Sequence, residues 1–326
     1  MAEGRDISHE IARIAAGEAV CCALDTFALY EVSGADSTEF LHGQVTADLK
    51  GLARGEAIAG AYCTAKGRVL ATFFALKGEQ GWTLVLPRSG AAVAMKRLSM
   101  YVLRAKVSIR DVSAALRVIG VANAAAATMA GGPSAGATIA SAMAAAGIRE
   151  LGSIALAPRH GLILVAAEAA DAAMRGLVAA GYQPVAPPAW KWLDVAQGIA
   201  WIVEATQEAF TPHMLNLDLT GAVNFQKGCY PGQEIVARTE YRGEVKRRMV
   251  RAQVQTTEAP HAGQSVFAPD VGAQTAGTVV DAAPGPSGGW EVLVVMHKSS
   301  AQAGGVALGA LDGPPLSLLP LPYALP

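Results

Sequence analysis

The chain has little charge and few aromatic residues. Charged residues make up 16% of its 326 positions, aromatic residues make up 6%, and the formal net charge is −1. Such a balance provides no long-range field for nucleic acid or for an anionic membrane surface. We therefore expect neither as a direct partner.

Cysteine is also scarce, and none of the four residues forms a CxxC pair or a metal-ligand spacing. This argues against zinc and against a dedicated iron–sulfur cluster. The first twenty residues are interrupted by charge and do not read as a signal peptide. We expect a reducing, cytoplasmic location and no bound metal. The cysteines and the histidines considered as ligands are Cys21, Cys22, Cys63, Cys229, His42, His160 and His213.

Charge is absent altogether from Val118 to Ile148, a stretch longer than a membrane span. It consists mostly of Ala, Gly, Ser and Thr, with Gly131-Gly132-Pro133 in the middle, which would break a spanning helix. We predict a strand, a loop and an alanine-rich helix of a soluble lobe.

The length predicts two or three lobes. Residues 1–115 are expected to form a first α+β lobe, residues 116–244 a second, and residues 245–326 a small antiparallel β-barrel. The expected strands are Phe27–Val32, Ala57–Thr64, Arg68–Leu76, Trp82–Leu86, Val107–Val112, Leu116–Ala122, Ile154–Ala157, Leu162–Ala166, Met249–Val254, Ser265–Ala268, Ala276–Val280 and Trp290–Val295. The expected helices are Ser37–Gln44, Ala91–Leu103, Ala135–Ala146, Ala169–Ala180 and Trp190–Trp201.

The most distinctive segment is the octapeptide KGCYPGQE, residues 227–234. Gly228 and Gly232 permit backbone angles closed to other residues, and Pro231 favours a first helical turn. Cys229 would then lie at a helix N-terminus near Lys227, and both features should lower the pKa of its thiol. The alternative is that Cys229 is a small buried hydrophobe.

The other residues of the motif have plainer expected roles. Lys227 either lowers the cysteine pKa or is a solvated turn residue. Gln233 and Glu234 are expected to cap the helix, and Tyr230 to pack. A local basic concentration follows, which could receive an acidic partner or RNA phosphates, or simply be a solvated strand entry. Its members are Arg238, Arg242, Lys246, Arg247, Arg248 and Arg251.

The segment KGCYPGQEIVAR, followed by YRG and KRR, resembles the signature of the YgfZ family of folate-binding proteins. This family is related to the aminomethyltransferase T-protein of the glycine cleavage system. The resemblance extends to ALYEVSGADSTEFLHGQVTADL, YCTAKGRVLATF, FTPHMLNLDLTGAVNFQKG and the terminal PLPYALP, and so spans nearly the whole chain.

The resemblance implies a T-protein-like α+β fold, with two ferredoxin-like lobes and a C-terminal β-barrel around a central cavity for tetrahydrofolate. It also implies a role in iron–sulfur cluster assembly or repair that depends on Cys229 and affects tRNA modification indirectly. The implied partners are iron–sulfur assembly factors or cluster enzymes, and the protein is expected to be a monomer. The implied folate residues are Phe27, which replaces the family's tryptophan, together with Trp190 and Lys227. Lys227 would meet the glutamate tail of the folate, and the basic concentration could receive folate polyglutamate.

The chain departs from the T-protein where that enzyme carries carboxylates. The strand after the Lys66-Gly67 turn has Ala71 and Thr72 at the aspartate pair, and Ala196 replaces a glutamate that can bond a pterin. None of these side chains can hold a negative charge near a developing iminium. We therefore expect no aminomethyltransferase activity. The alternatives are a folate-dependent transferase or demethylase, and a scaffold that binds partners without folate.

Overall fold

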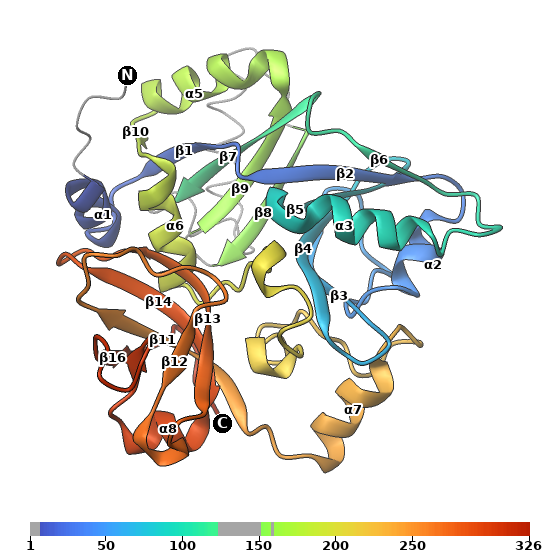
Figure 1. Cartoon of the computed structure of the whole chain (residues 1–326). Helices are drawn as coiled ribbons and strands as arrows, with labels where there is room; N and C mark the ends of the chain where they lie inside the picture. Colours follow the sequence, from blue (N-terminus) through green and yellow to red (C-terminus); the bar gives the residue numbers. More distant parts are fainter. Residues whose placement is uncertain (1–6, 123–150, 158–159) are drawn as a thin grey trace.

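The structure is a computed structural model that describes residues 7–122, 151–157 and 160–326. The described chain forms three β-sheets with helices between and around them (Figure 1). Two sheets have five strands each and the third has six. A large apolar core draws residues from all three sheets and from the helix that carries Trp190. The expected α+β class is confirmed.

The first sheet is antiparallel throughout and has the order β3-β4-β5-β2-β6. One face packs against α3, whose apolar residues Ala91, Ala94, Met95 and Leu98 follow helical spacing. The other face enters the large core, so the interior strand β4 is apolar on both faces. The elements are β2 (Phe27–Ser33), α2 (Ser37–His42), β3 (Ala57–Cys63), β4 (Val69–Lys77), β5 (Gly81–Pro87), α3 (Arg88–Ser99) and β6 (Ser108–Asp111).

The second sheet has the order β10-β1-β7-β9-β8 and includes a strand from the start of the chain. In β1, Cys21 packs against α5 on one face and Cys22 enters the large core on the other, as the pleat requires. We did not predict this strand from the sequence. The elements are α1 (Ile7–Ala15), β1 (Val20–Leu24), β7 (Leu116–Ala122), β8 (Gly152–Ala157), β9 (His160–Ala166), the 3-10 turn Ala167–Ala169, α5 (Ala170–Ala179) and β10 (Gln183–Pro184).

The division into units at residues 115 and 244 stays a prediction, but strand pairing crosses the first boundary. Strand β1, from the range assigned to the first lobe, pairs with β7 of the second range. The strand expected within Val118–Ile148 is present as part of β7. The helix expected at Ala135–Ala146 lies outside the described residues. In the part of the chain that is described, no helix is both long enough and apolar enough to cross a membrane.

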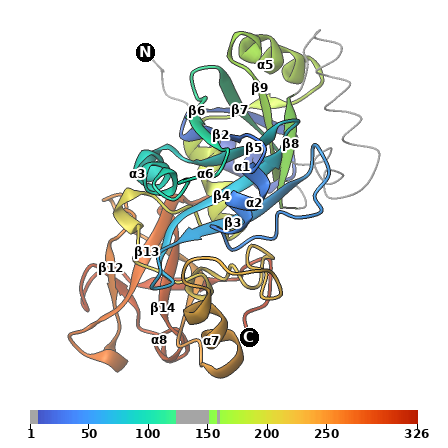
Figure 2. The same cartoon turned by 90° about the vertical axis from the view of Figure 1, so that its right-hand side faces the viewer.

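The C-terminal sheet is a curled antiparallel sheet with the order β15-β12-β13-β14-β11-β16. Its inner face forms a core of Val, Ala, Met and Leu, and its β13 strand packs against α6. Figure 2 shows it below the other two sheets. The elements are β11 (Arg247–Val254), β12 (Ser265–Phe267), the 3-10 turn Pro269–Val271, β13 (Thr275–Pro284), β14 (Trp290–His297), α8 (Lys298–Ala303), β15 (Ala307–Leu308) and β16 (Leu316–Leu319).

Helix α6 lies between the second sheet and the C-terminal sheet (Figure 1). It spans Pro187–Ala196 and is thus shorter than the expected Trp190–Trp201. Gly198 has φ +66°, a left-handed conformation that ends a helix, so Trp201 lies in an irregular segment. Between α6 and the C-terminal sheet the chain has 3-10 turns at Glu204–Thr206 and His213–Leu215, then α7 (Gln233–Arg242).

Candidate functional site

Cys229 is the one exposed cysteine of the four, all of which lie in the described residues. It belongs to an irregular segment and stands three residues before Gly232, the N-cap of α7. The alternative that Cys229 is a buried hydrophobe is therefore wrong. Its thiol can meet a small molecule or a partner protein without rearrangement of the core.

Lys227 points inward, and its residue is only 8% exposed. Its ammonium donates hydrogen bonds to the carbonyl oxygens of His42, Val45 and Ala47, the last two at 2.6 and 2.8 Å. Three acceptors occupy all three ammonium hydrogens. Burial lowers the pKa of Lys227 to about 8, and the charge of Asp48 opposes this shift. The lysine ties the motif to the segment after α2, so the expectation of a solvated lysine is wrong.

The two motif glycines differ in their backbone. Gly232 has φ +81°, and a Cβ there would lie 2.4 Å from the carbonyl oxygen of Thr64 and 2.7 Å from Cα of Gly67. The motif thus approaches the β3–β4 turn as closely as only glycine allows. Gly228 has no φ in the left-handed region, and a Cβ there would be 3.8 Å from His42 Nε2. Helix α7 begins at Gln233 rather than at Pro231, because the left-handed Gly232 interrupts it.

The remaining motif residues lie around this loop. Tyr230 is buried, with the Lys227 ammonium 5.4 Å from its ring centroid, and burial raises the pKa of its phenol. Gln233 Nε2 donates to the Lys227 carbonyl oxygen at 3.4 Å. Glu234 is exposed in the first turn of α7, where a carboxylate suits the helix dipole, and Arg238 is exposed one turn later.

Half of the basic residues after the motif are engaged by neighbouring side chains. Arg248 is buried and donates to both carboxylate oxygens of Asp218, at 2.6 and 2.8 Å. Arg247 contacts His297, and Arg251 pairs with Glu291. These pairings favour the structural interpretation of the arginines over a surface for RNA phosphates.

Phe27 and Trp190 line one cavity, of about 970 Å³, between α6, the start of β2 and the C-terminal sheet. Trp201 and Trp290 also line it, so four aromatic rings share the wall. Phe27 packs edge-on against Trp201, with ring centroids 4.8 Å apart. The two aromatic residues that the resemblance assigned to folate thus line one cavity.

Trp190 is held deep in this wall and is 1% exposed. Its ring packs edge-on against His160 with centroids 4.6 Å apart, and a Cβ at Gly120 would lie 2.5 Å from it. The glycine on β7 therefore makes room for the indole. Among the described residues, Trp190 Nε1 has no hydrogen-bond partner.

Two carboxylates and two cations complete the cavity. Asp194 accepts a hydrogen bond from Trp201 Nε1 at 3.0 Å. Asp281 lies 2.6 Å from Lys191 Nζ; burial raises the pKa of Asp281 and the lysine opposes that shift. Arg88 donates to the Phe27 carbonyl oxygen at 2.8 Å. Such a mixture of rings, carboxylates and cations suits a flat, polar, partly anionic ligand.

A second cavity, of about 510 Å³, lies against β3, β4 and the segment that follows α6. Trp201 borders it from the other side, and Phe74 packs on that indole with centroids 5.6 Å apart. The Thr72 hydroxyl donates to the Ala200 carbonyl at 2.7 Å and accepts from the Ile202 N–H at 3.0 Å. Among the described residues that line this cavity, none is charged. We call it the central cavity and the first one the large cavity.

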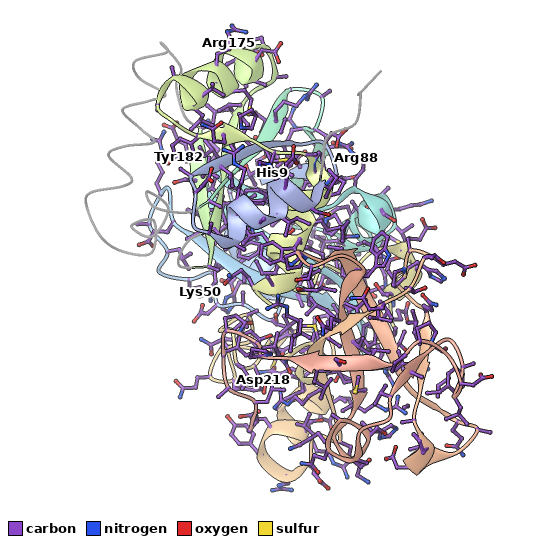
Figure 3. The ribbon with its side chains drawn as sticks, turned by 90° about the vertical axis from the view of Figure 1, so that its left-hand side faces the viewer. His9, Lys50, Arg88, Arg175, Tyr182 and Asp218 are labelled. Atoms are coloured by element: carbon purple, nitrogen blue, oxygen red, sulfur yellow. The ribbon has the colours of Figure 1, made fainter. Side chains whose placement is uncertain are left out.

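The motif loop, residues 227–232, is separate from the large cavity. Cys229 lines neither cavity as the described residues outline them. Figures 1 and 2 both show α7, which follows the motif, well away from α6. Figure 3 shows Arg88, at the cavity, and Lys50, close in sequence to the Lys227 acceptors, on opposite sides of the molecule. The structure thus groups Phe27 with Trp190, and Lys227 with Cys229.

One cluster of possible metal ligands escaped the sequence reasoning. Ligand atoms of His213, Asp218 and Glu240 lie within 4.8 Å of one another. Asp218 is already paired with Arg248, and His213 Nε2 lies 3.0 Å from Glu240 Oε2. Asp218 thus has the Arg248 cation as a partner and Glu240 has the His213 imidazole, so we assign no metal here.

Several cavity residues were also missed: Arg88, Lys191, Asp194, Trp201, Asp281 and Trp290. They come from four separate segments, and no local pattern joins them. Trp201 carried the best signal, an aromatic residue soon after a helix-ending glycine, but it was placed inside the helix.

No family model matches the chain, but several curated proteins are similar to it. A tRNA-modifying protein YgfZ of Edwardsiella ictaluri is 34% identical over 249 residues, 74% of this chain and 73% of the relative. The chain belongs to the YgfZ family. The YgfZ protein of Klebsiella pneumoniae, also called tRNA-modifying, is 29% identical over 310 residues, 93% of this chain and 92% of that one.

A solved structure shows the fold. The glycine cleavage system aminomethyltransferase T of Bartonella henselae superposes with a TM-score of 0.71, covering 98% of this chain and 89% of that chain, at 17% identity. At that identity the match establishes architecture only. The expected T-protein-like fold of this YgfZ protein is confirmed.

Proposed function

We propose that this YgfZ protein binds tetrahydrofolate, or a one-carbon derivative, in the large cavity. We further propose that it uses the Cys229 thiol to support iron–sulfur proteins and, through them, tRNA modification. The observation that carries the folate part is the wall of the large cavity, where Phe27, Trp190, Trp201 and Trp290 meet two carboxylates and two cations. In this proposal the protein acts as a cytoplasmic monomer.

The cavity fits each part of such a ligand chemically. Aromatic rings pack against a pterin, and its ring N–H groups suit a carboxylate such as Asp194. Lys191 and Arg88 offer positive charge to a glutamate tail. The volume lies within the range of about 300–1,000 Å³ usual for small-molecule sites. Lys227 is not assigned to the ligand, because its ammonium hydrogens are engaged.

The thiol part rests on the exposure of Cys229 and on the name of the relatives. A thiolate there can attack an electrophilic one-carbon unit, exchange with another thiol, or contact iron or sulfur held by a partner. One thiolate is too few to retain a cluster, which normally takes four ligands. Iron–sulfur assembly factors or cluster enzymes are therefore the proposed partners. The relatives' name, tRNA-modifying protein, supports the downstream link.

The structure gives little support to the alternative, a folate-dependent transferase or demethylase. Thr72, at one of the carboxylate positions of the T-protein pattern, uses its hydroxyl to hold the segment after α6. Ala71 is buried in the core of the first sheet. The large cavity does hold Asp194 and Asp281, and turnover of an amine donor to methylene-tetrahydrofolate by the purified protein would favour the transferase.

The folate proposal is tested by a matched pair of substitutions on the two sides of Trp201. Phe27→Leu alters the large cavity, whereas Phe74→Leu alters the central cavity, and both rings contact the same indole. Titration with tetrahydrofolate, followed by tryptophan fluorescence, should show weaker binding for Phe27→Leu and little change for Phe74→Leu. The reverse order would move the ligand to the central cavity, and absence of binding to the unaltered protein would reject the proposal.

The thiol proposal needs a measurement in cells. Cells that carry Cys229→Ala as their only copy should lose much of the activity of a cluster-dependent tRNA-modifying enzyme, while the variant accumulates normally. Cys63→Ala is a suitable control, because Cys63 is buried in the core. Full activity with Cys229→Ala would remove the thiol from the proposed function.

A further inference from the structure

The basic residues of α7 are exposed. Arg238 and Arg242 lie four residues apart on this helix, and Lys246 follows it at another exposed position. Among the described residues, none of the three side chains has an ion pair or a hydrogen bond. Like charges at this spacing on a helix repel each other. The two arginines are therefore available to carboxylates from outside this chain.

The arginines share an exposed face of α7 with two apolar side chains. Val236 is the one buried residue of this helix. Because an α-helix turns by about 100° per residue, Arg238, Tyr241 and Arg242 lie on the side opposite Val236. Ile235 and Tyr241 are 43% and 67% exposed, and Figure 1 shows the helix at the edge of the molecule. We call Ile235, Arg238, Tyr241 and Arg242 the α7 face.

The helix is held in place against the body of the protein. Gly232, its N-cap, approaches the β3–β4 turn too closely for any side chain. Glu240, on the inner side of the helix, lies 3.0 Å from His213 Nε2. Phe225 packs edge-on against Tyr241, with ring centroids 6.2 Å apart. The α7 face is thus presented in a fixed position, which lowers the entropic cost of binding a partner.

The α7 face lies next to the exposed thiol. Cys229 stands three residues before Gly232, and three residues of chain span at most about 11 Å. The helix itself has ten residues and is therefore about 15 Å long. A stable protein interface covers about 800 Å² of each partner. A protein that covers the α7 face therefore also reaches the thiol.

We propose that the α7 face binds a carboxylate-rich surface of the protein that Cys229 serves. This inference rests on the proposed function and specifies the chemistry of its partner. Arginine and tyrosine are enriched at the energetic centres of protein interfaces, and a guanidinium can bind a carboxylate through two parallel hydrogen bonds. RNA is the weaker match, because the chain has a formal net charge of −1 and two arginines neutralise few phosphates.

The test reverses the charge of the α7 face and leaves the thiol in place. One variant combines Arg238→Glu with Arg242→Glu, and a second combines Arg238→Lys with Arg242→Lys. Arg175→Glu, at an exposed position of α5 at the far end of the molecule, is the control (Figure 3). Each variant is the only copy in cells, and the activity of a cluster-dependent tRNA-modifying enzyme is measured. The glutamate pair should lose nearly as much activity as Cys229→Ala, whereas the lysine pair and the control should keep most of it.

The thiol of the glutamate pair is checked in the purified protein. Cys21, Cys22 and Cys63 are buried, so iodoacetamide alkylates Cys229 selectively in the folded chain. The alkylation rate and the thermal unfolding of the glutamate pair should match those of the unaltered protein. Full enzyme activity in cells with the glutamate pair would overturn this proposal and leave the thiol proposal standing. Full activity with Cys229→Ala would instead reject the proposed function.

A second measurement identifies the partner directly and does not depend on the folding of the glutamate pair. The photoreactive residue benzoylphenylalanine replaces Tyr241, the cells are irradiated, and the product is analysed by mass spectrometry and for nucleic acid. We expect a cross-link to an iron–sulfur assembly factor or cluster enzyme, at a peptide that carries Asp or Glu residues. A cross-link to RNA, a cross-link to a surface without carboxylates, or no cross-link would overturn the proposal.

Discussion

The motif loop and the large cavity differ in how closely their residues are packed. In the motif loop, backbone contacts are tight: Lys227 uses three carbonyl oxygens, and Gly232 touches the β3–β4 turn, so that one thiol stands exposed. In the large cavity the aromatic side chains are packed against one another and enclose about 970 Å³, with Trp190 buried in the wall. The first region presents a reactive group, and the second offers a binding surface. Changes in one should therefore leave the other largely intact.

The largest effect is expected from Lys227→Met. It removes a buried cation and leaves three buried carbonyl oxygens without their donor, which we expect to cost about 3 kcal/mol of unfolding free energy. Lys66→Met, at an exposed position of the adjacent turn, should stay within about 0.5 kcal/mol. Urea unfolding measures both. Equal stability of the two variants would contradict the anchoring role.

The next largest difference in stability is expected between substitutions of the two motif glycines. Gly232→Ala forces a left-handed residue and a 2.4 Å contact with a backbone oxygen, and should cost about 2 kcal/mol or more. Gly228→Ala meets only ordinary contact and should stay within about 0.5 kcal/mol. Thermal unfolding under matched conditions tests this order. A Gly228→Ala variant as unstable as Gly232→Ala would show that the loop is constrained at both positions.

A smaller effect is expected at the edge of the large cavity. Lys191→Met removes a half-exposed cation next to Asp281, and should weaken binding of a folate with a glutamate tail about threefold. The pterin alone, which lacks the tail, should bind both proteins equally. Iodoacetamide alkylation of Cys229 should not change. An equal loss of affinity for the folate and for the pterin alone would show that Lys191 does not act on the glutamate tail.

The smallest expected effect depends on pH. The pKa of His42 is lower in the folded chain than the value of 6.5 it has when unperturbed, so the unfolded chain binds more protons as the pH falls through that region. Stability should therefore fall toward pH 5.5, and fall less in His42→Asn. Urea midpoints at pH 7.5 and 5.5 give the comparison. A steeper fall of stability in the variant would contradict the lowered pKa assigned to His42 in the folded chain.

The sequence predicted local elements and motifs better than the contacts between residues far apart in the chain. Strand β4 and helix α3 follow from alternation and helical spacing, and Gly232 from its place before a helix. Strand β1 was missed, because its two adjacent cysteines face different cores and give no one-sided pattern. The inward direction of Lys227 depends on carbonyl oxygens 180 or more residues away in sequence. The cavity itself joins segments from separate parts of the chain that only the fold brings together.

The most direct test titrates the unaltered protein, Phe27→Leu and Cys229→Ala with tetrahydrofolate side by side, following tryptophan fluorescence. The account predicts a saturable change in the unaltered protein, the same curve for Cys229→Ala, and binding about tenfold weaker for Phe27→Leu. No saturable change in the unaltered protein, or a Phe27→Leu curve that overlays it, would contradict the account.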